Sequence, residues 1–309
     1  MLDLVLIERV HGFGNLQKEP RAGFPAATIY EKADVDISRA QTRKKPWRAP
    51  FGSCFQHTMP NITLYDSPLA DGKTTWSPYM WKARLFLNFK GIPYKTEWVD
   101  FVDIESHCKK HGLKPTGKRS WDGQDLYTLP AIHDASTGVY VSDSWLIAEY
   151  LEKQYPDTPT LFPSGTKGLQ QVFTDLHLQT VFPLRAFLIP RVPRKLSPRS
   201  AEYFIRTREI SFKKKLEDIV PKGDEATKEW SNLEVGFDKI AAWYAQTDDK
   251  GQFMLGETIS WADITAVSFH LWFKSIFGEE SEEWKRISAW SGGRWIDLMK
   301  ALDVYSTIA

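Results

Sequence analysis

Residues 125–151 read DLYTLPAIHDASTGVYVSDSWLIAEYL, and they carry the clearest indications of the fold. Two short apolar runs on either side of the turn at Ser136–Gly138 predict a hairpin, and the run from Trp145 predicts a helix. Pro130 interrupts the first run. Because a proline nitrogen has no hydrogen to donate to a ladder, it indicates an edge or a cis turn rather than a regular central strand. The stretch therefore predicts a strand-turn-strand-helix unit with a bend at its entrance.

The residues before this unit predict a second group of strands and helices. The expected elements are strand 61–66, helix 78–90, strand 94–101, a short helix 103–112, strands near 126–132 and 138–142, and helix 144–155. This order is βαβ followed by ββα. A crossover helix makes the first two strands parallel, and the hairpin adds an antiparallel edge, which is the thioredoxin-like arrangement.

The chain after this unit differs in composition and pattern. Residues 156–166 contain three prolines, which break helical and strand periods and predict an interdomain linker. Residues 167–309 predict helices throughout. We therefore expect an α/β thioredoxin-like N-terminal domain over 59–155 and an all-α C-terminal domain over 167–309.

One helix start in the second domain has a recognisable signature. Ser260 and Asp263 form a Ser-x-x-Asp capping box, and Ile259 before the cap is placed to pack against Ile264. Because this arrangement satisfies the free N–H groups of a helix terminus, we assign both polar residues to folding and none to catalysis.

The first 58 residues lack a sustained period, and glycine, proline and arginine are scattered through them. We expect residues 1–58 to be a poorly ordered leader, with Met59 as an alternative initiator. An organellar targeting segment is a competing interpretation, but acidic residues such as Glu8 and Glu19 are unusual in a transit peptide.

Composition excludes several functions. A length of 309 residues suggests about two domains, and a net charge of +1 gives no electrostatic reason to bind nucleic acid. No apolar run reaches the roughly 18 residues of a membrane helix. Only Cys54 and Cys108 occur, so we expect a reducing, cytoplasmic location. Cys108 has His107 and His111 nearby, but such surface groups are more often solvated than metallated, and we expect no metal.

The predicted helix over 78–90 begins with a hydroxyl residue followed by proline. Ser77 precedes Pro78, which occupies the first helical position, where its missing N–H costs nothing. A hydroxyl at the positive end of a helix can hydrogen-bond an anion. The alternative is that Ser77 only caps the helix. Thr74 and Thr75 are rival hydroxyls, and Tyr65 and Tyr79 are less favoured.

A second helix start, at Asp143 and Ser144, offers free N–H groups to a carboxylate, although either residue could simply cap its own helix. With the bend at Pro130 and the Ser77-Pro78 pair, the chain resembles the glutathione transferase family. The resemblance implies a cis Pro130 and a Leu129 backbone that pairs with the cysteinyl part of glutathione, the co-substrate. It also implies that Asp143 and Ser144 bind the γ-glutamyl end.

The same resemblance gives Ser77 its role. A serine there holds the glutathione thiolate and lowers the thiol pKa, whereas the cysteine of other members would form a mixed disulfide. Residues 77–99 and 201–209 are also similar to bacterial β-etherases and to the fungal etherase-related class. This implies aryl ethers or other hydrophobic aromatic electrophiles as substrates.

The resemblance implies partners as well. Tyr79, Phe182 and Phe187 are weak candidates for contact with the aromatic substrate, and a homodimer is expected. A non-catalytic carrier of aromatic compounds is the alternative function, and an assembly module without ligand is a third. The polar loop 114–124 is longer than in most relatives, and we expect a role in ligand or partner contact.

Overall fold

The computed structural model describes residues 61–247 and 251–308. The expectations for the leader 1–58 and for Met59 lie outside these residues. Within them, no helix is both long enough and apolar enough to cross a membrane.

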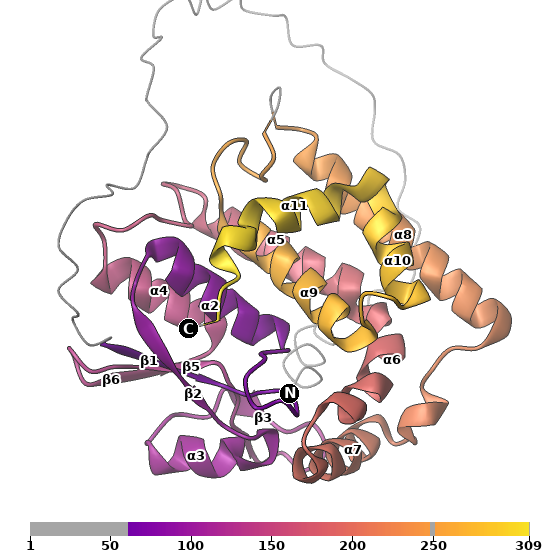
Figure 1. Cartoon of the computed structure of the whole chain (residues 1–309), viewed down its shortest axis with the longest axis horizontal. Helices are drawn as coiled ribbons and strands as arrows, with labels where there is room; N and C mark the ends of the chain where they lie inside the picture. The colour runs from indigo at the N-terminus through magenta and orange to yellow at the C-terminus, as the bar shows by residue number, and fades with distance from the viewer. Residues whose placement is uncertain (1–60, 248–250, 309) are drawn as a thin grey trace, which may run out of the picture.

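A four-stranded sheet forms the centre of the N-terminal half (Figure 1). Its order is β2 (Tyr94–Trp98), β1 (Ile62–Asp66), β5 (Ala131–Asp134) and β6 (Val139–Ser142). β1 and β2 are parallel and the other neighbours are antiparallel. Helix α2 (Pro78–Lys90) connects the parallel pair. This arrangement confirms the predicted thioredoxin-like topology.

The two faces of the sheet carry different helices. Alternate side chains of a strand point to opposite faces. Asp66 of β1 forms an ion pair with Arg84 of α2 at 2.7 Å, which places α2 on one face together with α4 (Ser144–Gln154). Tyr65 points the other way and meets His107 of α3 (Ile104–Lys110). Helix α3 therefore covers the face opposite α2.

Two predicted strands are wrong in extent. The strand expected over 126–132 is divided: β4 (Asp125–Leu126) pairs with β3 (Gly117–Lys118) in a separate two-stranded sheet, and β5 begins only after Pro130. Pro130 cannot donate to a ladder, so the main sheet starts beyond it. The strand expected over 94–101 ends at Trp98, and a short 3-10 helix follows.

The rest of the chain is helical. Its helices are α5 (Lys167–Val181), α6 (Arg185–Leu188), α7 (Pro198–Phe212), α8 (Gly223–Tyr244), α9 (Trp261–Phe277), α10 (Glu282–Ala289) and α11 (Arg294–Leu302). Its short 3-10 helices are η3 (Phe182–Leu184), η4 (Ile189–Lys195), η5 (Leu216–Asp218), η6 (Trp290–Gly293) and η7 (Asp303–Tyr305), and a further one, η2 (Phe101–Asp103), lies in the N-terminal half. This confirms the predicted fold class. The exact domain bounds stay a prediction.

Helix α9 is almost entirely buried and packs against α2, α5 and α11. It begins with the predicted capping box, in which the Ser260 N–H donates to the Asp263 carboxylate at 2.8 Å. Asp263 also accepts the N–H of Met254 at 2.9 Å. The box thus ties the loop before α9 to the start of the helix.

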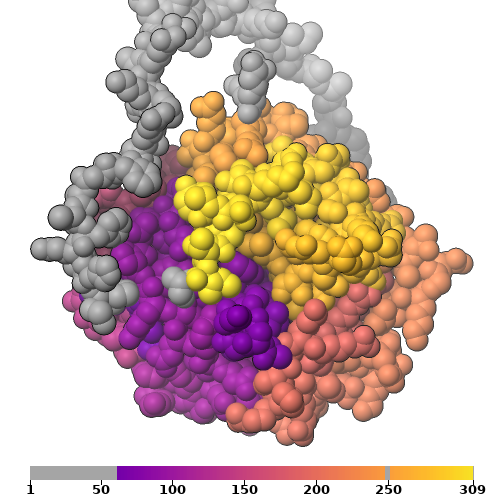
Figure 2. All heavy atoms as spheres, in the orientation of Figure 1, coloured from indigo at the N-terminus to yellow at the C-terminus, as the bar shows by residue number. Residues whose placement is uncertain are grey.

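The C-terminal segment returns to the N-terminal half. The Asn88 side chain of α2 donates to the carbonyls of Tyr305 and Thr307 at 2.7 and 2.9 Å. Figure 2 shows the yellow C-terminal residues against the indigo and purple segment. Together with the contact of α2 with α9, this joins the two halves and fixes the walls of the cleft between them.

Candidate functional site

A cavity of ≈ 1170 Å³ lies between the two halves of the chain. Its lining comes from α2, β6 and the start of α4 on one side, and from α5 and the start of α9 on the other. Ligand pockets usually measure about 300–1,000 Å³, so this cleft has room for more than one small ligand.

The N-terminus of α2 lies beside this cleft. Ser77 is the N-cap residue, yet its side chain makes no capping hydrogen bond, and its hydroxyl has no hydrogen-bond partner among the residues that the structure describes. Ser77 itself is buried and is not part of the cavity lining, but Tyr79, two residues further on, is. The helix therefore does not use this hydroxyl.

The rival hydroxyls are engaged elsewhere. The Thr75 hydroxyl donates to Asp66 at 2.9 Å, and the Thr74 hydroxyl donates to Asp71. Tyr65 points to the α3 face of the sheet. Of the predicted candidates near the start of α2, Ser77 thus has the hydroxyl that is free to bind another group.

The Leu129–Pro130 peptide bond is cis. Neither the N–H nor the C=O of Leu129 has a hydrogen-bond partner within residues 61–247 and 251–308, whereas the Pro130 C=O accepts the N–H of Asp143 at 3.2 Å. Neither Leu129 nor Pro130 lines the cavity. The hydrogen bond from Asp143 joins this bend to the lining, because Asp143 is one of the cavity residues.

Asp143 and Ser144 start α4 and both line the cavity. Asp143 caps its own helix, since its carboxylate accepts the N–H groups of Trp145 at 2.8 Å and Leu146 at 3.2 Å. It holds a φ of 82°, which is rare for a residue other than glycine. Ser144 is buried, and its hydroxyl has no hydrogen bond to any described residue. Ser144 is therefore the member of the pair with a free donor.

Sequence reasoning missed Lys82, which lines the cavity from α2. Lys82 is 1% exposed, and its ammonium lies 5.2 to 5.6 Å from the ring centroids of Tyr79, Trp261 and Phe269. It forms no ion pair within the described part of the chain. Burial lowers its pKa to about 8, although the nearby carboxylates of Asp143 and Asp175 act in the opposite direction.

The position of Lys82 contained a signal that was not used. Met80, Trp81 and Ala83 surround it in sequence and are buried, so a lysine there belongs to an otherwise apolar stretch of α2. Burying an ammonium is costly unless a partner or ligand compensates its charge. A lysine in such a stretch indicates either a salt bridge or an anion site.

The aromatic candidates divide into two groups. Tyr79 and Phe182 line the cavity. Phe187 does not: it is buried against Trp230, with ring centroids 4.8 Å apart. Trp145 and Trp261 line the cavity and were not singled out from the sequence. The sequence does not reveal them as neighbours, because they lie far apart along the chain and meet only after the two halves pack together.

Comparisons with known proteins assign the chain to a family whose two domains match the two halves of this fold. The family model of the glutathione S-transferase N-terminal domain matches residues 76–154, and that of the glutathione S-transferase C-terminal domain matches residues 168–305. The chain belongs to the glutathione S-transferase family, which uses glutathione as co-substrate.

Individual relatives support this assignment. Glutathione S-transferase-like protein ustS from Aspergillus flavus is 31% identical over 247 residues, which cover 76% of this chain and 86% of that protein. The structure of glutathione S-transferase CsGST63524 of Ceriporiopsis subvermispora in complex with glutathione is 42% identical, with a TM-score of 0.74, and the match covers 80% and 98% of the two chains. Glutathione transferase GSTFuA3 from Phanerochaete chrysosporium is 40% identical, with the same coverage and TM-score.

Proposed function

We propose that this protein is an enzyme that activates the thiol of glutathione for attack on hydrophobic aromatic electrophiles, aryl ethers among them. The observation that carries the proposal is the Ser77 hydroxyl, which stands at the N-terminus of α2 without a hydrogen-bond partner among the described residues. The family membership supplies glutathione, and the free hydroxyl supplies a donor for its sulfur.

In the proposed reaction the Ser77 hydroxyl donates a hydrogen bond to the glutathione sulfur. The hydrogen bond and the positive end of the α2 dipole favour the thiolate over the thiol, so the thiol pKa falls. The thiol proton passes to solvent, and the thiolate then attacks the electrophilic carbon of an aryl ether. A C–S bond forms, the C–O bond breaks, and the aryloxide leaves with the electron pair and takes a proton from solvent.

The remaining groups would position glutathione. The free N–H and C=O of Leu129 would pair with the cysteinyl backbone, as an added strand does. The Ser144 hydroxyl and the Lys82 ammonium would bind the α-carboxylate of the γ-glutamyl end. Asp143 and Asp175 line the same cavity and act on Lys82, and their carboxylates would face the ammonium group of the γ-glutamyl end. In this arrangement the buried charge of Lys82 gains a partner when glutathione binds.

The rest of the cleft suits an aromatic ligand. Tyr79, Trp145, Trp261 and Phe182 contribute rings to its wall. Flat apolar ligands bind well in pockets lined by aromatic side chains. The cleft volume leaves space for such a ligand beside glutathione. Phe187 is removed from our substrate-contact prediction because it packs against Trp230 instead.

Two experiments test this proposal: a measurement of glutathione binding, followed by a measurement of turnover. Millimolar glutathione should raise the thermal midpoint of the full chain, since a ligand of the native state stabilises it. Ser77→Ala should then lower kcat/KM with an activated aryl substrate about 10- to 150-fold, the loss of one hydrogen bond to an anion. Thr74→Val is the matched control, because its hydroxyl already bonds to Asp71. Full activity of the alanine variant would refute the role of Ser77.

A carrier of aromatic compounds is the second candidate function, and the size of the cleft favours it as well. A carrier would bind glutathione and aromatic compounds with negligible turnover. The Ser77→Ala variant separates the two functions. An enzyme loses turnover and retains aromatic binding, whereas a carrier shows no turnover to lose.

We also propose that the protein forms a homodimer in the cytoplasm. Helix α5 exposes Leu169, Val172 and Leu176 along one side, and Leu146 of α4 is exposed as well. Exposed apolar side chains at a spacing of three and four residues share one helix face and are typical of an interface.

The proposed cytoplasmic location rests on the low cysteine content. Burial raises the pKa of the Cys108 thiol to about 11, so this thiol is not a nucleophile.

A further inference from the structure

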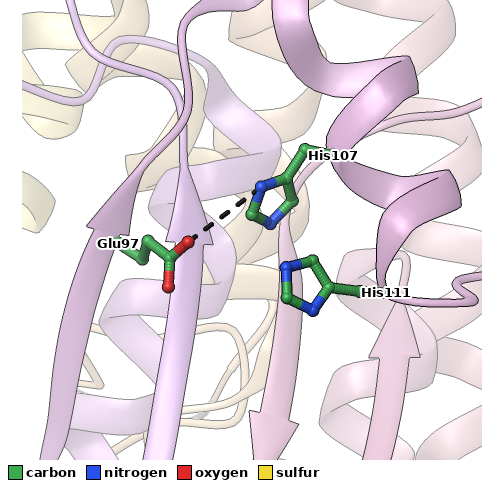
Figure 3. A group of neighbouring side chains, drawn as sticks. All are labelled: Glu97, His107 and His111. Carbon is green, nitrogen blue, oxygen red and sulfur yellow. Dashed lines mark ion pairs between the residues drawn. The ribbon is translucent and has the colours of Figure 1, made fainter.

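A second cluster of polar side chains lies on the face of the sheet that α3 covers. Glu97 of β2, His107 of α3 and His111 at the end of α3 each offer a ligand atom, and these atoms all lie within 4.8 Å of one another. Figure 3 shows both imidazoles projecting from α3 toward the Glu97 carboxylate. We propose that these three residues bind one divalent transition-metal ion, with Zn²⁺ as the probe of choice.

The fold brings the three residues together for simple reasons. His107 and His111 are four residues apart, so their side chains lie on the same face of a helix. Glu97 pairs with Tyr65 in the parallel register of β1 and β2. Tyr65 contacts His107, with ring centroids 4.7 Å apart, so the helix lies over this part of the sheet. The carboxylate and the two imidazoles therefore face one space.

The proposed metal ligands differ from the group considered in the sequence analysis, which was His107, Cys108 and His111. Cys108 lies between the two histidines in the sequence, but it is fully buried on another side of α3 and belongs to the hydrophobic core. Glu97, ten residues before His107, takes its place near the imidazoles. From the sequence we expect no metal at His107 and His111, and the proposal departs from that expectation because Glu97 adds a carboxylate to the two imidazoles. The proposed ion plays no part in the transferase reaction.

Two imidazoles and a carboxylate are a donor set that suits Zn²⁺, with water as the fourth ligand. The shortest approach that involves Glu97 is 4.0 Å, between His107 Nδ1 and Glu97 Oε1. Ligand atoms about 2.1 Å from a tetrahedral zinc are about 3.4 Å apart, so the groups must close by about 1 Å. The Glu97 side chain is 51% exposed, and its carboxylate has room for this movement.

The histidines are held in place before any ion binds. Tyr65 packs edge-on against the His107 ring, and Tyr140 lies 5.6 Å from the His111 ring. One nitrogen of His107 faces Glu97, and the other, Nε2, is buried without a hydrogen-bond partner in the described part of the chain. A buried nitrogen without a partner loses the hydrogen bond that water would give it. Coordination through Nε2 would give this buried nitrogen the partner that it lacks among the described residues.

Charge sets the expected affinity. Glu97 supplies one negative charge, and the charge of Lys110 also acts at His107 and opposes a cation. We therefore expect a dissociation constant in the micromolar range. The proposed metal site is next to the cleft in the sequence, because Gly112, which follows His111, lines the cleft.

Glutathione is left out of the metal-binding assay because its thiol is itself a zinc ligand.

Titration calorimetry with Zn²⁺ on the full chain, without an affinity tag, tests the proposal. We expect one ion per chain, with at least tenfold weaker binding in Glu97→Gln and in His111→Asn. Glu282→Gln, an exposed glutamate on α10, is the control and should bind as the wild type does. Co²⁺ should bind at the same site and give visible d–d absorption that both variants lose.

Two outcomes would overturn the proposal. One is a wild type that binds no Zn²⁺ at millimolar concentration. The other is a pair of variants that bind Zn²⁺ as tightly as the wild type, which would place the ion elsewhere on the chain. Thermal midpoints of the variants close to that of the wild type show that a loss of binding is not a loss of folding.

Discussion

Among single residues, Lys82 brings a buried positive charge to the cleft. Its ammonium is buried among three aromatic rings, and burial lowers its pKa to about 8. A free lysine keeps its proton up to a pH of about 10.5. Between these values the unfolded chain holds a proton that the folded chain has lost, so stability rises with pH across this window. Below pH 8 both states are protonated and the full cost of the buried charge remains.

This gives a prediction for Lys82→Met. The variant removes the buried charge but keeps the length of the side chain, so it should be more stable at pH 7 by about 3 kcal/mol or less. The gain should shrink as the pH rises from 8 to 10. Urea unfolding at several pH values measures it. Lys90→Met is the control: Lys90 is also buried on α2 but has Glu152 at 3.6 Å, so its loss should not stabilise the chain.

The same variant should bind glutathione less well. We expect S-methylglutathione, which has no free thiol, to bind Lys82→Met at least about tenfold more weakly at pH 7, since a hydrogen-bonded ion pair is lost. The difference in affinity between the wild type and the variant should become smaller as the pH rises above 8, because Lys82 loses its proton. Calorimetry at pH 6.5 and 8.5 compares them. If the wild type and the Lys82→Met variant bound S-methylglutathione equally well at both pH values, Lys82 would not belong to the glutathione site.

The sequence did not reveal Lys82 for a physical reason. The residue type and its place on α2 were visible, but its burial depends on Trp261 and Phe269 of α9, far away in the chain. Ser77 and Ser144 were found because helix starts have local signatures. Phe187 was chosen on residue type alone, and packing against Trp230 decides its place. Local signals thus predict candidates at helix ends, and cleft residues need the packed structure.

At the scale of elements, the start of α9 shows how a local signature fixes a helix that both halves use. The Asp263 carboxylate accepts N–H groups from Ser260 and Met254 and is buried. The sequence predicted this box because all its members lie within four residues. It could not predict the division of the strand over 126–132, because β4 pairs with β3 in the loop before it. The apolar content there predicts one strand, whereas Pro130 separates the two parts in the structure.

The capping box yields a stability prediction. Asp263→Ala leaves the buried N–H of Ser260 and the partly buried N–H of Met254 without a partner, so the free energy of unfolding should fall by about 2–4 kcal/mol. Asp297→Ala on α11 is the control, because its side chain is exposed and should change stability by less than about 0.5 kcal/mol. Chemical denaturation measures both. An Asp263 variant as stable as the wild type would show that the box contributes nothing to folding.

For the whole molecule, the thioredoxin-like sheet and the helical half were predictable because the succession of strands and helices has local signals in the sequence. The family was predictable from its resemblance at Ser77-Pro78, Pro130 and Asp143-Ser144. The cleft was not, since its walls come from both halves of the chain. The apolar side of α5 leads to the last prediction about assembly. Leu169 and Val172 are 71% and 56% exposed.

Replacing both residues with glutamate should convert the proposed dimer into a monomer. Charged groups at the centre of an interface lose solvent without gaining a partner, which opposes association. Light scattering after size-exclusion chromatography measures the mass of each form. Val235→Glu on α8, also an exposed apolar position, is the comparison and should leave the dimer intact. A wild type that is monomeric at all concentrations would exclude the proposed homodimer.

The proposed role of Ser77 depends on the ionisation of the bound glutathione sulfur, which titration of the bound thiol measures. The ultraviolet absorbance of the thiolate can be followed against pH in the complex of glutathione with the wild type and with Ser77→Ala. We predict that the pKa of the bound thiol lies below that of free glutathione in the wild type and returns toward the free value in the variant. Equal pKa values in the two complexes would contradict the role of Ser77 as the group that activates glutathione.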